Sequence, residues 1–249
     1  MSAKLKSDFK CPDCNTTFQV SRDPELEGRF AEMFSGLVLL CDECAQKRQD
    51  KEEKEREEAR AQDLRRRAYG RSYLPVDAET CTFKNSLADA EALNPEHWAW
   101  ANGTNRDNIW ACGPPGVGKS WLSYCILNRT LNNGYMSMAI SGPSLSALGR
   151  SYHSERDRVL NMTKHVQALL IDDIDKARWQ EDGITLLWEV LDARQRSRKQ
   201  TIITSNQAPE EFIKALRKTE NTTYIPAILD RLNPCHRMVF QGASLRSVK

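Results

Sequence analysis

The sequence predicts an α/β protein whose main domain is a three-layer structure around a largely parallel β-sheet. Three observations carry this prediction. Strand-like and helix-like runs alternate from about residue 69 onward, a glycine-rich loop joins the first of these strands to a helix, and two closely spaced cysteine pairs lie near the N-terminus. The chain therefore divides into a small cysteine module at residues 1–44, a charged helical linker at 45–68 and an α/β domain at 69–249.

Composition narrows the class of protein. The 249 residues are enough for one large domain and a small one, and 28% of them are charged, with a net charge of only +2. Any nucleic-acid contact must therefore come from a local basic patch. No apolar run is long enough for a transmembrane helix, and "MSAKLKSDFKCPDC" lacks the apolar core of a signal peptide. We expect a cytoplasmic protein with no membrane partner.

The N-terminal module carries two Cys-x-x-Cys pairs, Cys11 with Cys14 and Cys41 with Cys44. A segment this short cannot bury enough apolar surface to fold alone, so it needs a staple. The spacing predicts a structural zinc site, in which four thiolates surround one ion. A redox pair or chance clustering is the alternative. The remaining cysteines have no such spacing and are expected to be buried small residues: Cys81, Cys112, Cys125 and Cys235.

The segment "AQKRQDKEEKEREEARAQDLRRRA" at residues 45–68 is rich in charged residues and helix formers. As one helix it would span roughly 36 Å. It has no apolar heptads, which argues against a long coiled coil. We interpret it as a solvated connecting helix, with a flexible charged linker as the alternative.

The α/β domain contains four strand-like runs, "DNIWACG", "YMSMAIS", "ALLIDDI" and "QTIITSN". The first leads into "GPPGVGKS", which fits the phosphate-binding loop G-x-x-x-x-G-K-[ST] ahead of a helix. In such a loop the backbone amides surround the phosphates, Lys119 reaches the β- and γ-phosphates, and Ser120 ligates Mg²⁺. The predicted ATP contacts are Gly113, Pro114, Pro115, Gly116, Val117, Gly118, Lys119, Ser120 and Trp121.

Polar residues end the third and fourth strand-like runs. Asp172 is placed to hold Mg²⁺ through water, and Asp173 to orient or deprotonate the attacking water. Asn206 is expected to sense the γ-phosphate and position water, although taken alone it could be a turn residue. Asp175 is interpreted only as a solvated or helix-capping acid.

The order of these motifs resembles AAA+ ATPases, and more narrowly the DnaC/DnaI-type replicative helicase loaders and the related IstB-type transposition ATPases. The resemblance covers about residues 75–249 and rests on "CGPPGVGKSWLSYCI", "ALLIDDID", "LDARQRSRKQTIITSN", "AILDRL" and "VFQGASLRS". Many ATPases of this kind have Glu where this chain has Asp173, so we expect slow, switch-like hydrolysis. Almost no helical lid follows the sensor strand, so we expect assembly to depend on a partner.

The resemblance also implies roles for two arginines. Arg231, in "LDRL", matches the arginine finger that completes a neighbouring subunit's site, and Arg246, in "SLRS", matches the sensor-2 arginine near the phosphates. Arg231 could instead cap a helix or pair with Asp230, and Arg246 could be a solvated tail residue.

Two loops after strand ends combine basic and aromatic residues, as binding of single-stranded DNA requires. The aromatic members could equally pack in the core. If substitutions of Tyr152, Trp179 and Arg178 left DNA affinity unchanged, the basic stretch Arg194–Lys199 would become the next candidate. The predicted DNA contacts are Arg150, Tyr152, Lys176, Arg178 and Trp179.

The family resemblance implies a bacterial or phage-encoded helicase loader with ATP, Mg²⁺ and Zn²⁺ as cofactors. Such a protein binds a hexameric replicative helicase through its zinc module, assembles on it as an oligomer, and places it on single-stranded DNA. Three alternatives remain: an IstB-type transposition helper, a small-molecule P-loop kinase, and a nucleotide-binding scaffold with little turnover.

Overall fold

The computed structural model describes residues 5–22, 38–69, 74–85, 88–151, 153–218 and 223–245. The chain forms two compact units, Met1–Asp63 and Leu64–Lys249, and each is described by itself. Among the helices described, none combines the length and the apolar character needed to cross a membrane.

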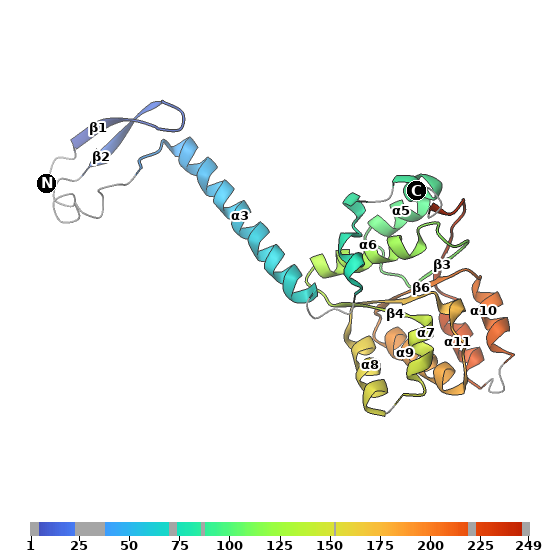
Figure 1. Ribbon diagram of the computed structural model, residues 1–249. Helices are drawn as coiled ribbons and strands as arrows, with labels where there is room; N and C mark the ends of the chain where they lie inside the picture. Colours follow the sequence, from blue (N-terminus) through green and yellow to red (C-terminus); the bar gives the residue numbers. More distant parts are fainter. Residues whose placement is uncertain are drawn as a thin grey trace. The chain divides into compact units, whose positions relative to one another are not determined.

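The N-terminal unit contains one antiparallel hairpin and most of a long helix (Figure 1). Strand β1, Leu5–Lys10, pairs with β2, Thr17–Arg22, and brings Phe9 opposite Phe18 with ring centroids 6.4 Å apart. The stretch "CPDCNTTFQV" predicts a strand after the first cysteine pair, which is β2, whereas β1 was not predicted. Helix α3, Asp42–Tyr69, confirms the helical interpretation of the charged segment, and pairs such as Glu43–Lys47 lie one turn apart on its surface.

The larger unit is built on a five-stranded parallel sheet with the order β4-β5-β6-β3-β7. The first four strands along the chain in this sheet, β3 to β6, coincide with the four predicted runs. The fifth, β7, was not predicted, because its sequence "HRMV" is short and half polar and lies at the sheet edge. The strands are β3 (Ile109–Cys112), β4 (Ser137–Ser141), β5 (Ala168–Asp172), β6 (Gln200–Ser205) and β7 (His236–Val239).

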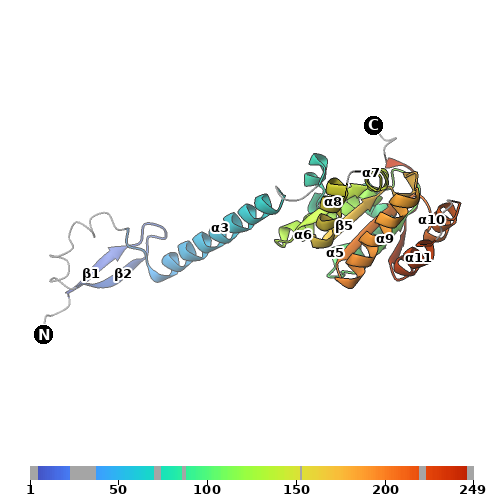
Figure 2. The same cartoon turned by 90° about the horizontal axis from the view of Figure 1, so that it is seen from below.

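Helices cover both faces of this sheet and make the predicted three layers (Figures 1 and 2). One face carries α4 (Ala88–Leu93), α5 (Pro95–Asn102) and α6 (Lys119–Asn132), preceded by the short 3₁₀ helices η1 (Val76–Thr80) and η2 (Phe83–Asn85). The other face carries α7 (Gly142–Leu148), α8 (His153–His165), α9 (Glu181–Arg196), α10 (Pro209–Leu216) and α11 (Ile225–Leu232).

Alternation of side chains along the strands divides the apolar core into two halves. In β5, Leu169 packs into the core on the α9 side, whereas Leu170 packs into the core on the α6 side. Trp110 and Ile109 divide in the same way along β3. Strands buried on both faces read as continuous apolar runs, which is why these segments were recognisable in the sequence.

A buried arginine joins three elements on the α9 side. Arg194, near the end of α9, is completely buried. Its guanidinium donates to the backbone oxygens of Thr163, Val166 and Gln200, and its Nε donates to the hydroxyl of Thr201 at 2.9 Å. Burial lowers its pKa to about 9, so the group is still charged at neutral pH. Arg194 therefore satisfies backbone acceptors at the end of α8 and the start of β6, and it cannot serve in the DNA-binding stretch considered above.

We expect Arg194→Met to lower the free energy of unfolding by about 3 kcal/mol or more. The substitution keeps much of the side-chain volume but leaves several buried carbonyl oxygens without donors, at about 1–3 kcal/mol each. Urea denaturation followed by circular dichroism measures the loss. Arg158→Met, on the exposed side of α8, is the control and should change stability by no more than about 0.5 kcal/mol. Equal losses in both variants would contradict this role of Arg194.

Candidate nucleotide site

The glycine-rich loop leaves β3 after Cys112 and enters α6 at Lys119. Gly116 and Gly118 adopt positive φ angles of 83° and 96°, and Gly118 is the N-cap of α6. A Cβ added at Gly116 would lie 2.1 Å from the hydroxyl of Ser244, so the loop needs glycine both for its turn and for this close approach. The loop therefore ends at the N-terminus of a helix, where the backbone amides and the helix dipole favour anions.

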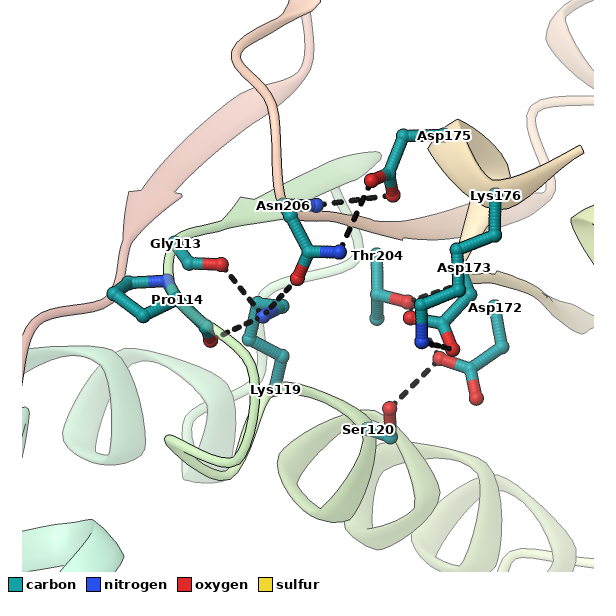
Figure 3. Close-up of polar contacts among 10 residues, drawn as sticks. All are labelled: Gly113, Pro114, Lys119, Ser120, Asp172, Asp173, Asp175, Lys176, Thr204 and Asn206. Atoms are coloured by element: carbon teal, nitrogen blue, oxygen red, sulfur yellow. Dashed lines mark hydrogen bonds and ion pairs between the residues drawn. The ribbon is translucent and has the colours of Figure 1, made fainter. Parts of the chain in front are cut away.

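Lys119 is 6% exposed, and its ammonium lies between the loop and the end of β6 (Figure 3). Its Nζ donates to the backbone oxygens of Gly113 and Pro114, both at 2.7 Å, and to Oδ1 of Asn206 at 3.2 Å. Burial lowers its pKa, while the nearby carboxylates of Asp173 and Asp175 oppose that shift. The loop thus holds one cation beside the tip of the strand that ends in Asn206.

A set of oxygen atoms lies at the end of β5. The hydroxyl of Ser120 donates to Oδ1 of Asp172 at 2.8 Å, and the hydroxyl of Thr204 donates to the same oxygen at 2.5 Å. Hydroxyl and carboxylate oxygens are the ligands that Mg²⁺ takes in nucleotide sites. The structure brings together the two predicted Mg²⁺ ligands, and Thr204, which is fully buried, is a member of this cluster that the sequence analysis missed.

Asp173 follows in a left-handed conformation, with φ 54°. Its backbone N–H donates to the hydroxyl of Thr204 at 2.8 Å, and its carboxylate pairs with Nζ of Lys176 at 2.5 Å (Figure 3). Thr204 therefore accepts from one aspartate and donates to the other, which sets the relative placement of the two acids.

Asn206 is held by a residue to which the sequence analysis gave no role at the site. The carboxylate of Asp175 accepts the backbone N–H of Asn206 at 3.0 Å and its Nδ2 at 3.0 Å. The spacing of Asp175 from the acidic pair was visible in the sequence, but nothing there indicated that it faces the end of β6.

A cavity of about 420 Å³ adjoins the glycine loop. Its lining includes the polar residues Lys119, Asp173 and Asn206, and the predicted contacts Pro115, Gly116, Gly118, Ser120 and Trp121. The sequence analysis missed the mostly apolar part of the lining, which suits a planar base. That part comprises Pro75, Ala78, Cys81, Tyr124 and Leu245.

The C-terminal segment closes over the glycine loop. The N–H of Phe240 donates to the backbone oxygen of Cys112 at 2.7 Å, and the N–H of Leu245 donates to that of Gly116 at 3.0 Å. Arg246 lies outside the described residues, so its predicted contact with the phosphates stays a prediction. Its neighbour Leu245, however, touches both the loop and the cavity.

The structure does not bring every predicted residue to this cavity. Arg231, on α11, pairs with Asp192 of α9 rather than with Asp230, and its NH1 donates to the backbone oxygen of Ala227 at 2.8 Å. The side chain of Arg231 is only 18% exposed. Its role toward a neighbouring subunit stays a prediction.

The DNA-binding expectation needs one correction. Trp179 is 7% exposed, packs against Phe212 with ring centroids 6.2 Å apart, and donates its Nε1 to the backbone oxygen of Ile174. Because its side chain is buried, Trp179 is not available to stack on a nucleotide base in this fold. Arg150, Lys176 and Arg178 are exposed, and Tyr152 lies outside the described residues.

The N-terminal unit brings four sulfur atoms within 4.8 Å of one another. They belong to Cys11, Cys14, Cys41 and Cys44. The Sγ atoms of Cys14 and Cys41 are 3.5 Å apart. Four thiolates at about 2.3 Å from a central zinc ion would be about 3.8 Å from one another, so this cluster fits a tetrahedral site.

Hydrogen bonds around this cysteine cluster shift its thiols in opposite directions, and a salt bridge joins its two halves. Backbone hydrogen bonds, the strongest from Cys41, lower the pKa of Cys11 to about 6, whereas side-chain hydrogen bonds with Cys14 and Cys41 raise the pKa of Cys44. Arg48 of α3 donates Nε to Oδ2 of Asp13 at 2.7 Å and NH2 to Oδ1 at 2.5 Å. This bidentate pair ties the first knuckle to the helix that carries Cys44.

A parallel sheet of this order, a glycine loop at the start of α6, acids at the end of β5 and an asparagine after β6 define a P-loop ATPase of the AAA+ type. The chain matches the family described as IstB-like ATP binding protein over residues 47–249, and it belongs to that family. It is therefore an ATPase, and the small-molecule kinase alternative loses its support.

Two relatives with similar sequences come from insertion sequences of bacteria. The insertion sequence ATP-binding protein y4pL of Sinorhizobium fredii is 34% identical over 146 residues, which cover 56% of this chain and 57% of y4pL. The IS1162 ATP-binding protein of Pseudomonas fluorescens is 33% identical over 102 residues, covering 40% of this chain and 44% of the relative. The chain thus spans about half the length of the curated relatives it matches.

Solved structures support the fold. DnaI matches with a TM-score of 0.57 and 16% identity, over 68% of this chain and 96% of that one. The DnaC helicase loader matches with a TM-score of 0.52 and 16% identity, over 67% and 100% of the two chains. DnaA of Aquifex aeolicus bound to AMPPCP matches with a TM-score of 0.53 and 17% identity, over 64% and 49%. At these identities the similarity concerns the fold alone.

Two substitutions at this site should affect nucleotide binding and ATP hydrolysis separately. We expect Lys119→Ala to abolish measurable ATP binding, because it removes the cation that faces the phosphates. We expect Asp173→Asn to keep binding and to lose turnover by about 100-fold or more, because an amide cannot accept the proton of the attacking water. Binding of a fluorescent ATP analogue and release of phosphate measure the two effects. Normal hydrolysis by Asp173→Asn would show that another group is the base.

Proposed function

We propose that this protein is an ATP-switched loader of a hexameric replicative helicase, which it places on single-stranded DNA in the bacterial cytoplasm. The single observation that carries this proposal is the four-cysteine cluster. It lies at residues 11–44, ahead of the stretch that matches the IstB-like family at residues 47–249. A separately folded module in front of an ATPase is suited to holding a protein partner while the ATPase domain changes state.

The partner-binding module would be organised by Zn²⁺. The four sulfur atoms would all be ligands, which leaves no open coordination position, so the ion would be structural. Its binding would stabilise a unit in which, among the described residues, Phe9 packs against Phe18. Along the chain, helix α3 follows this module and leads into the ATPase domain.

The ATPase would turn over slowly. Ser120 and Asp172 would hold Mg²⁺, which neutralises phosphate charge when bound. Asp173 would accept the proton of the attacking water, but its carboxylate is engaged by Lys176 at 2.5 Å. That ion pair must open before Asp173 can act as a base, and the short aspartate side chain adds to the distance. Both features favour a switch over rapid hydrolysis.

Assembly on the helicase would complete each site from a neighbouring copy. Arg231 would act in trans on the γ-phosphate, and Arg246 would act on the phosphates in its own subunit. In a single copy Arg231 is largely buried and paired with Asp192, and it is not among the residues that line the cavity. To act on a neighbouring copy, its guanidinium would have to leave Asp192.

We expect mixtures of Arg231→Ala and Lys119→Ala subunits to recover part of the ATPase activity that each variant lacks alone. Interfaces that join an intact nucleotide loop to an intact finger would form in the mixture. An arginine finger contributes about 10³–10⁵ in rate in GTPases, and a slower ATPase would show less. Absence of recovery, under conditions where the wild-type protein assembles, would argue against a role in trans.

A second candidate function is that of a transposition helper, and the sequence relatives favour it because both are ATP-binding proteins of insertion sequences. The two functions differ in the DNA they require. A loader needs single strands, for which Arg150, Lys176 and Arg178 supply exposed cations. Fluorescence anisotropy with ATP, comparing a single-stranded and a duplex oligonucleotide, separates them, because tighter binding of duplex DNA would favour the transposition helper.

The loader function is tested by capture of the helicase. We expect the wild-type protein to carry one zinc per chain and to retain a hexameric replicative helicase from its own host on an affinity column. We expect Cys44→Ser to lose zinc and helicase capture while ATP binding persists, because the ATPase domain has its own core. The control is Cys235→Ser, which changes a buried thiol outside the cluster. Capture that is unaffected by Cys44→Ser would exclude the cysteine module as the helicase-binding element.

A further inference from the structure

Asp175 makes a two-point contact with the residue at the tip of β6. One carboxylate oxygen accepts the backbone N–H of Asn206 at 3.0 Å, and the other accepts its side-chain Nδ2 at 3.0 Å (Figure 3). The carboxylate lies on η3 (Ile174–Lys176), the short turn directly after the acidic strand. Two strand tips that are separate in the sequence are therefore joined by one side chain.

This contact determines which way the amide of Asn206 faces. Because Nδ2 is held at the carboxylate, Oδ1 points toward Lys119, whose Nζ lies 3.2 Å away. The reversed amide would bring its oxygen against a carboxylate and its N–H groups against an ammonium. Both contacts would be repulsive, so Asp175 and Lys119 together select one orientation.

Asp173, the residue before η3, is also held at the tip of β6. The last backbone pair between β5 and β6 is Ile171 with Ile203. Two residues beyond Ile171, the N–H of Asp173 donates at 2.8 Å to the hydroxyl of Thr204, which directly follows Ile203. Beyond that pair the sheet is extended by two side-chain bridges, Thr204 to the backbone of Asp173 and Asp175 to the backbone of Asn206. The predicted base and the predicted sensor are therefore placed by reciprocal contacts between the two strand tips.

We propose that Asp175 is the positioning residue for hydrolysis: it fixes the amide of Asn206 so that its oxygen accepts a hydrogen bond from the attacking water or from Lys119. This inference rests on the proposed role of Asn206 as the γ-phosphate sensor. One Nδ2 hydrogen is used by Asp175, and the other is free to donate to a phosphate oxygen. Asp175 itself would touch neither ATP nor water.

An electrostatic role for Asp175 predicts the opposite result. A carboxylate near the phosphates repels them, so its neutralisation alone would tighten ATP binding and leave turnover unchanged or faster. Loss of positioning instead lowers turnover at nearly constant ATP affinity, because the contacts made by Lys119 and the glycine loop persist.

The experiment compares Asp175→Asn, Asp175→Ala, Asn206→Ala and the double variant Asp175→Ala/Asn206→Ala with the wild-type protein. We expect both Asp175 variants to lower kcat by about 10- to 100-fold, the factor that follows from losing hydrogen bonds to a charged acceptor. The dissociation constant for ATP should stay within about threefold. The double variant should be no slower than Asn206→Ala, because the two residues act as one unit. Asp157→Asn, on the exposed side of α8, is the control and should match the wild type.

The side-chain amide of Asn206 can also be observed directly by NMR in the wild-type protein, so this test does not require an Asp175 variant that folds. With ¹⁵N-labelled asparagine, the Nδ2 signal that disappears in Asn206→Ala should be displaced from its random-coil position and protected from exchange with water. In Asp175→Asn, which preserves the side-chain shape, it should return toward that position. A wild-type signal at the random-coil position would overturn the inference.

The kinetic outcomes distinguish the sensor role of Asn206 from the positioning role of Asp175. Normal turnover by Asn206→Ala would overturn both the sensor role and the inference. Slow turnover by Asn206→Ala with normal turnover by both Asp175 variants would overturn the inference alone. A further loss of turnover in the double variant, beyond that of Asn206→Ala, would show that Asp175 acts independently of Asn206 and would also overturn it.

Discussion

The parallel, in-register pairing of β3, β6 and β5 is the constraint on which the nucleotide site depends. Ile109 pairs with Ile202, and Ile171 pairs with Ile203, so the three strands end at one edge of the sheet. The glycine loop, the acidic pair and Asn206 follow these ends directly. A shift of one strand by a single residue would separate these groups, because it moves the strand end by about 3.3 Å and turns every side chain of that strand to the opposite face of the sheet.

Beyond the last backbone pairs of the sheet, hydrogen bonds made by side chains connect the ends of β5 and β6. Thr204 joins the two aspartates of the acidic strand, and Asp175 joins the following turn to Asn206. These bridges restrict the groups that would surround the γ-phosphate to a small set of orientations before a nucleotide arrives. Such preorganisation matters for phosphoryl transfer, in which positioning and electrostatic stabilisation account for most of the catalysis.

The two units of the chain are stabilised by different physical means. The ATPase domain buries two apolar layers against its sheet and satisfies interior carbonyl groups with Arg194. The described part of the N-terminal unit has an aromatic pair and a cluster of four thiols, and under the proposed zinc site a metal ion would stabilise its structure. A unit of that kind can be conserved in shape while its surface changes to fit a partner, which is consistent with the proposed division of labour.

The sequence by itself determined the features that depend on local pattern: four of the five parallel strands, the glycine loop, the acidic strand end, the charged helix and the cysteine spacing. Short-range periodicity and motif chemistry are enough to predict these. The tertiary structure decided what depends on contacts between distant segments. It buried Trp179 against Phe212, turned Asp175 toward Asn206, and brought the segment before α4 and the end of the chain together as walls of the cavity. No pattern within a few residues encodes such contacts, because they arise only when the sheet brings strand ends and helices together.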